Sequence, residues 1–316
     1  MIYKNSIKIL FSNFDIVWKN ILYYILVFLI TGGLCYICIN PIYKLLSAGG
    51  LVTDFLNVYS DFLSNLNLTA LFTSINTLFE KLTEILQNNL SHVWINFVGI
   101  GTTLLFFKFI LSNLTIMPSC NSLHYYMGSM NKHGYYLSFG ETFGRNFRFV
   151  LVNFLVMLPL RVLYLGIFIL CLKLFKISFV MSIMAIIIII FGFVLLFSLK
   201  YSIFAGWAPT MCVMNYGVFK SLKVSIKNAF RIFPKVFSNS IGIVITIILS
   251  NVLIGTFTFL VGLVLTIPAS YLLYSIFGMV VVYEGQGMRY YVDVYNVITP
   301  KKKEVSDKLK SMKFIV

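Results

Sequence analysis

Six stretches of about twenty apolar residues constrain this chain more than any other feature. They lie near Ile21–Ile39, Trp94–Ile116, Phe149–Leu172, Ile177–Leu199, Ser240–Val261 and Leu263–Tyr283. A helix of this length crosses the hydrocarbon core of a bilayer. The composition agrees, because 59% of the 316 residues are hydrophobic and only 11% are charged, against about 25% charged residues in soluble domains. We therefore predict an all-α integral membrane protein, with residues 1–300 forming a single transmembrane domain.

The basic residues predict how these spans are oriented. With the amino terminus in the cytosol, the four inner segments 1–20, 117–148, 200–239 and 285–316 hold 19 of the 25 Lys and Arg residues. The outer segments hold only four of them, which are Lys44, Lys81, Lys173 and Lys176. This asymmetry is what the positive-inside rule describes. We expect a multi-pass protein of the cell membrane with both termini in the cytoplasm.

The net charge of +15 indicates anionic lipid of the inner leaflet as a partner. Nucleic acid is not needed to explain a charge that the positive-inside rule already accounts for. A basic cytosolic tail, residues 301–316, contributes to this charge. The first outer segment, residues 40–93, is too long for a simple turn and has helical periodicity in its leucines and isoleucines. We expect an outer helical hairpin or a small cap there.

Three segments with apolar residues at helical spacing precede the first, third and fifth spans. The first covers Ile7–Trp18 and the second Phe139–Val150. The third runs from Leu222 to Phe233 and has basic residues on its other face, at Lys220, Lys223, Lys227, Arg231 and Lys235. We interpret all three as amphipathic interfacial helices, whose ammonium and guanidinium groups lie among lipid phosphates; packing on the protein's own inner surface is an equal alternative. The order of interfacial helix, span and return span predicts three repeated helical hairpins.

Two cations lie inside predicted spans. Arg161 follows Pro159 near the middle of the third span, and Lys108 lies in the second span. A central Arg or Lys costs at least roughly 2.5 kcal/mol on insertion scales, so each should face protein, water or a ligand. The spans contain no Asp or Glu, and Glu284 at the end of the sixth span is the candidate charge partner for Lys108.

These two cations allow two interpretations. In the first, Lys108 and Arg161 line an inward cavity and bind an anion or a lipid phosphate. In the second, they are satisfied by backbone carbonyls freed at Pro159, by a polar neighbour such as Asn96, or by a defect in the bilayer.

A family resemblance covers about residues 117–295. It is carried by five segments, Ser138–Phe147, Ala205–Pro209, Gly217–Ser225, Phe230–Phe237 and Tyr283–Arg289. The pattern resembles a group of bacterial polytopic membrane proteins that includes the membrane domain of some glycerophosphoryl diester phosphodiesterases. The resemblance implies a fold and a bacterial envelope location. It departs from the phosphodiesterases because no hydrolase domain follows, so no catalytic role carries over.

Other chemistry finds little support in the sequence. Cys35 and Cys38 form a CxxC inside the first span, where buried cysteine behaves as a small hydrophobe. The three histidines have no spacing that joins them to cysteines or carboxylates as metal ligands. Trp18, Trp94 and Trp207 lie near span edges, as headgroup anchors do. We expect no catalytic set, no metal and no cofactor.

The functional prediction follows from these features. We expect a non-enzymatic accessory or scaffold subunit of the bacterial envelope that binds lipid or a partner membrane protein. The alternative is a transporter or channel for an anionic substrate that uses Arg161 and Lys108. A lipid-modifying enzyme is a third class, for which the sequence offers no catalytic base.

Overall fold

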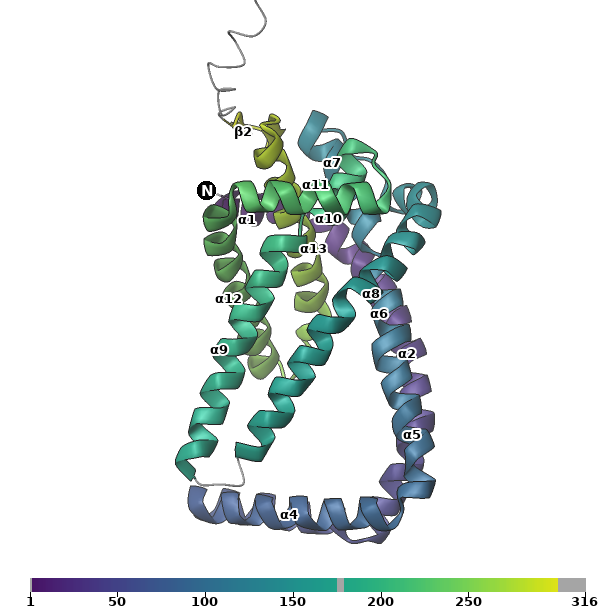
Figure 1. Cartoon of the computed structure of the whole chain (residues 1–316), viewed down its shortest axis with the longest axis vertical. Helices are drawn as coiled ribbons and strands as arrows, with labels where there is room; N and C mark the ends of the chain where they lie inside the picture. The colour runs from purple at the N-terminus through teal and green to yellow at the C-terminus, as the bar shows by residue number, and fades with distance from the viewer. Residues whose placement is uncertain (1, 175–178, 301–316) are drawn as a thin grey trace, which may run out of the picture. The chain divides into compact units, whose positions relative to one another are not determined.

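The computed structural model describes residues 2–174 and 179–300, and almost all of them are helical (Figure 1). Within these ranges, six helical segments are long and apolar enough to cross a membrane. They are Phe14–Ala48, Val93–Ser129, Tyr135–Leu174, Met181–Met214, Phe233–Phe257 and Leu263–Gln286. The predicted all-α polytopic architecture is confirmed. The start of the expected fourth span, residues 177–178, and the tail 301–316 lie outside the described residues.

The chain divides into two compact units. The first consists of the described parts of Met1–Tyr23, Asn113–Val156 and Gly192–Val316. The second consists of the described parts of Tyr24–Ser112 and Met157–Phe191. Three long helices, α2 (Phe14–Ala48), α8 (Tyr135–Leu174) and α9 (Phe179–Phe204), continue from one unit into the other.

The first unit is built around α13 (Leu263–Gln286). Its neighbours are α1 (Ile2–Ser12), α7 (Ile116–Ser129), α10 (Trp207–Met214), α11 (Val218–Arg231) and α12 (Phe233–Phe257). Leu272, Ile276 and Val280 of α13 are fully buried. The span of α13 is also far more buried than the other candidate spans in the described residues, and α13 is the central helix of this unit.

A tight turn joins α12 to α13, and the two helices pack along each other as a hairpin. This hairpin is the last of the three expected from the sequence. Phe259 and Leu260 in the turn have positive φ angles of 48° and 71°. After α13, Gly287 ends the helix in the left-handed conformation at φ 67°. Two short antiparallel strands follow, β1 (Tyr290–Tyr291) and β2 (Val297–Ile298), with β1 packed on α7.

Of the three segments expected to form interfacial helices before spans, only two are separate helices. The first and third are the separate helices α1 and α11, and Figure 1 shows α11 crosswise to α12. The chain turns at Asn13 after α1 and at Ile232 after α11, where Pro234 lies in the first turn of α12 and prevents α11 from continuing. The second segment is not a separate helix, which corrects our expectation. It continues into the span as α8, since residues 145–158 contain no Pro or Gly to end the helix.

The second unit contains a helical hairpin in the segment 40–93. It is formed by α3 (Leu51–Asn65) and α4 (Leu68–Asn88), which pack on each other. Lys81 of α4 forms an ion pair with Asp54 of α3. The side chain of Asn67 accepts hydrogen bonds from the first backbone amides of α4. The next segment is α5 (Leu90–Thr102), followed by the π-helix η1 (Thr103–Phe107) and by α6 (Lys108–Asn113).

Candidate functional site

The intramembrane Arg161 has protein contacts within the second unit. Its guanidinium carbon lies 3.8 Å from the ring centroid of Phe109. The guanidinium also donates to the backbone carbonyl of Leu105, with an N–O distance of 3.5 Å. Cation–π contact and carbonyl contact both lower the cost of a cation in an apolar environment. Arg161 therefore contacts protein groups, and the carbonyl belongs to Leu105 and not to the turn before Pro159.

The local backbone explains this carbonyl contact. Leu105 lies in η1, where the hydrogen bonds run from residue i to i+5 and the carbonyls are displaced from their α-helical positions. Lys108 follows η1 directly as the first residue of α6, and its side chain is exposed. Arg161 therefore contacts residues on both sides of Lys108. Nothing in the sequence pattern distinguishes η1 from an ordinary helical turn.

Glu284, the expected partner of Lys108, has its own cation. It forms an ion pair with Lys235 of α12, and the carboxylate is only 7% exposed. The hydroxyl of Tyr290 donates to the same carboxylate at 3.2 Å, and the side-chain amide of Asn5 donates to that hydroxyl at 2.8 Å. Burial and the Glu284 charge raise the pKa of Tyr290 well above its ordinary value, so the hydroxyl stays a donor at neutral pH. This network connects α1, α12, α13 and β1.

The basic helix α11 presents a row of cations. Lys220, Lys223, Lys227 and Arg231 are all exposed, and their spacings of three and four residues place them on one side of the helix. None of the four forms an ion pair within the described part of the chain. We call these four residues the α11 cation row. Lys235, the fifth basic residue of the predicted set, lies in α12 and is occupied by Glu284.

The opposite face of α11 is held by small side chains. Ser221, Ser225 and Ala229 recur every four residues and are the buried residues of the helix, which packs on α10 and α13. Gly206 allows the close approach, because a Cβ there would lie 2.9 Å from the Ser225 hydroxyl oxygen. The indole nitrogen of Trp207 donates to the backbone carbonyl of Val218 at 2.9 Å. This packing keeps the cation row on the outer side of the helix.

Trp207 therefore does not have the headgroup position that we expected. It is 1% exposed and meets the ring of Phe149 edge-on at 5.1 Å. Trp18 and Trp94 are exposed, at 59% and 63%. The indole of Trp207 can be buried because α11 supplies an acceptor for its N–H group.

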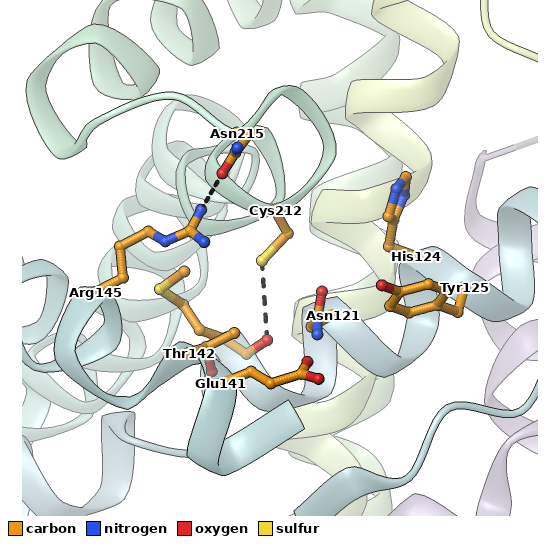
Figure 2. A pocket seen from close by; sticks show the side chains of 9 residues that line it. Asn121, His124, Tyr125, Glu141, Thr142, Arg145, Cys212 and Asn215 are labelled. Atoms are coloured by element: carbon orange, nitrogen blue, oxygen red, sulfur yellow. Dashed lines mark hydrogen bonds between the residues drawn. The ribbon is translucent and has the colours of Figure 1, made fainter. Parts of the chain in front are cut away.

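A polar pocket lies in the first unit between α7, the start of α8 and the end of α10 (Figure 2). Its volume is about 260 Å³, and its lining consists of Met117, Asn121, His124, Tyr125, Glu141, Thr142, Arg145, Cys212 and Asn215. The guanidinium of Arg145 donates to the side-chain oxygen of Asn215. Asn215 follows α10 in the left-handed conformation, which asparagine tolerates better than most residues.

The two charges of this pocket have different partners. The Glu141 carboxylate lies 3.1 Å from Nε2 of His133, whose ring stacks on Tyr125 at 4.4 Å. Nδ1 of His124 lies 2.8 Å from the hydroxyl oxygen of Tyr283. From the sequence we interpreted the segment Phe139–Val150, which contains Glu141 and Arg145, as an interfacial helix and missed the pocket. The signal that could have indicated it is an acidic and a basic residue four positions apart in a segment followed by a span.

Comparison with protein-family models, with curated proteins and with solved structures finds no match for this chain. The resemblance to bacterial membrane domains therefore stays a prediction. The fold by itself defines the class, which is an all-α polytopic membrane protein.

Proposed function

We propose that the protein is a non-enzymatic accessory subunit of a bacterial cell membrane that binds anionic lipid headgroups through the α11 cation row. The observation that carries this proposal is the arrangement of α11. Its small residues are packed on α10 and α13, and four cations without carboxylate partners in the described residues face outward. A helix fixed in this way keeps its cations on one outer side, so that only their side chains are ordered when phosphate groups bind.

The charge distribution supports a cytosolic position for α11. The segment that contains it lies between the fourth and fifth spans and holds six Lys and Arg residues. By the positive-inside rule, such a segment faces the cytosol, where the leaflet is rich in anionic lipid. Each basic residue near such a surface contributes about 1 kcal/mol, so the row contributes about 4 kcal/mol.

The alternative of anion transport has less support from the geometry. That hypothesis depends on Arg161 and Lys108 facing a cavity. Arg161 instead contacts the Phe109 ring and the Leu105 carbonyl. These contacts give Arg161 a role in packing α8 against η1 and α6 that needs no anion.

The proposal is tested by lipid retention. The protein is purified in mild detergent with phosphatidylglycerol and phosphatidylcholine added in equal amounts, and bound lipids are counted by native mass spectrometry. We expect phosphatidylglycerol to be enriched on the wild-type protein. Substituting Lys220, Lys223, Lys227 and Arg231 together by Gln should abolish the enrichment, because it removes the phosphate-binding charges.

A matched control lowers the net charge by the same four units elsewhere. Lys44, Lys81, Lys173 and Lys176, all in segments expected outside, are substituted by Gln. This control should retain phosphatidylglycerol. Equal loss in both variants, or no enrichment on the wild type, would contradict the proposal. Retention of a partner protein without anionic lipid would favour the scaffold alternative instead and would overturn the lipid assignment.

A further inference from the structure

The polar pocket between α7, α8 and α10 contains two opposite charges that do not pair with each other. Glu141 and Arg145 are one helical turn apart on α8, the spacing at which such residues ordinarily form an ion pair. In the part of the chain that the structure describes, neither forms one with the other. Arg145 is held by Asn215 and Glu141 by His133. Figure 2 shows the guanidinium and the carboxylate extending in different directions, with Cys212 between them.

One end of the pocket is built for an anion. The Arg145 guanidinium has five N–H donors, of which the Asn215 oxygen accepts from one nitrogen. Within the described residues the others are available to a phosphate, which guanidinium binds in bidentate geometry. The contact to Asn215 fixes the orientation of the guanidinium, so less side-chain entropy is lost when a ligand binds.

The other end is built for an ammonium group. The Glu141 carboxylate and Asn121 both line the pocket (Figure 2). The Asn121 side-chain nitrogen donates to the Ser138 hydroxyl at 3.3 Å, which directs the side-chain amide and leaves its carbonyl oxygen as an acceptor. A primary ammonium has three N–H donors and needs acceptors of this kind.

The dimensions limit the ligand to a small molecule. A cavity of about 260 Å³ is below the range of roughly 300–1,000 Å³ that is typical of sites for drug-sized ligands. Met117 and Cys212 supply the less polar part of the wall, against which a short carbon chain between the two charges would lie.

We propose that this pocket binds a small zwitterion whose phosphate contacts Arg145 and whose primary ammonium contacts Glu141. Aminoethyl phosphate is the simplest group with this chemistry, either free or as the headgroup of a phospholipid. This site is distinct from the α11 cation row, and it requires neither the anionic lipid nor the cytosolic position proposed for that row.

The test is calorimetric titration of the full-length protein in detergent with phosphoethanolamine. We expect saturable binding that weakens at least about tenfold in Arg145→Gln and in Glu141→Gln, since each removes one charge-assisted contact. Arg148→Gln is the matched control. It lies on the next turn of α8, is equally exposed and does not line the pocket, so its affinity should stay within about twofold of the wild type.

Further probes separate the outcomes. Displacement of phosphoethanolamine by nanodiscs of phosphatidylethanolamine, but not of phosphatidylcholine, would assign the site to the lipid headgroup; displacement by neither would assign it to the free solute. Both results support the zwitterion site. Inorganic phosphate that binds as tightly as phosphoethanolamine, with no effect of Glu141→Gln, would overturn the proposal. Absence of binding by a wild-type protein that melts cooperatively would also overturn it.

Discussion

At the residue scale, the buried carboxylate of Glu284 shows how this fold satisfies a charge. Its carboxylate is 7% exposed and has one cationic partner, Lys235, and one neutral donor, Tyr290. A buried charge is strongly destabilising when a partner is removed. The chain from Asn5 through Tyr290 to Glu284 therefore stabilises the packing of α1 and β1 on α13.

Tyr290→Phe should lower the stability of the protein. The substitution removes the donor to Glu284 and the acceptor of Asn5, and each lost bond to a buried polar group costs about 1–3 kcal/mol. The midpoint of thermal unfolding in detergent measures the effect. Tyr291→Phe is the control. Tyr291 is half-buried, and its ring faces the guanidinium of Arg289, an arrangement that Phe can keep. Equal midpoints for the two variants would show that the hydroxyl network contributes nothing.

The sequence could identify Glu284 as a carboxylate at the end of a span, but it could not give the partner. Depth along a span follows from residue counting, at about 1.5 Å per residue. The direction in which a side chain points around the bundle depends on packing, so Lys108 and Lys235 could not be distinguished. The same limit applies to Arg161, whose partner carbonyl lies in the π-helix η1, which the sequence does not indicate.

At the element scale, α13 makes one especially close contact with its neighbours. Gly278 lies against the turn at Ala205, where a Cβ on residue 278 would overlap the backbone carbonyl oxygen. The Ala205–Pro209 segment, which carried part of the family resemblance, is thus a packing surface for α13 and, through Gly206, for α11. Packing therefore explains the residues of this segment without a catalytic role.

Gly278→Ala should destabilise the protein by about 3 kcal/mol or more, because backbone atoms cannot move aside as a flexible side chain can. Gly285→Ala is the matched control in the same helix. Its Cβ would meet the Cβ of Asn228 at an ordinary 3.6 Å, and Ala favours the helix by up to about 1 kcal/mol. Fluorescence-detected size-exclusion chromatography after heating measures both variants. A Gly278→Ala protein as stable as the control would refute this description of the α13 contact.

The sequence predicted most of the helices but not which side of each helix is buried. Long apolar stretches specify spans because length and hydropathy alone decide insertion. For α11 the sequence left open whether the large apolar residues face lipid or the protein's own surface. Ser221, Ser225 and Ala229 are the buried residues, and Phe230 is exposed at 58%. In a bilayer, small residues make close helix contacts and large apolar residues are equally stable against lipid. Hydrophobic periodicity therefore does not identify the buried side.

At the scale of the whole molecule, the distribution of charge and the number of spans together predict the membrane topology. The described residues contain six candidate spans, and if all six cross the membrane, the segments before the first and after the sixth lie on one side of it. The basic residues predict that this side is the cytosol. The pocket could not be predicted at this scale, because its lining comes from three helices that are separated in the sequence and joined only by the fold.

The topology that the charges predict has the segment 200–239, which contains α11, in the cytosol and the segment 40–93 on the other side of the membrane. The most direct measurement is labelling of single cysteines in spheroplasts with a membrane-impermeant maleimide, after the five native cysteines are replaced by alanine. Lys227→Cys and Glu80→Cys both place the thiol at an exposed position. We expect Glu80→Cys to be labelled in intact spheroplasts and Lys227→Cys to be labelled only after permeabilisation. Labelling of Lys227→Cys from outside, or of both from the same side, would contradict this topology.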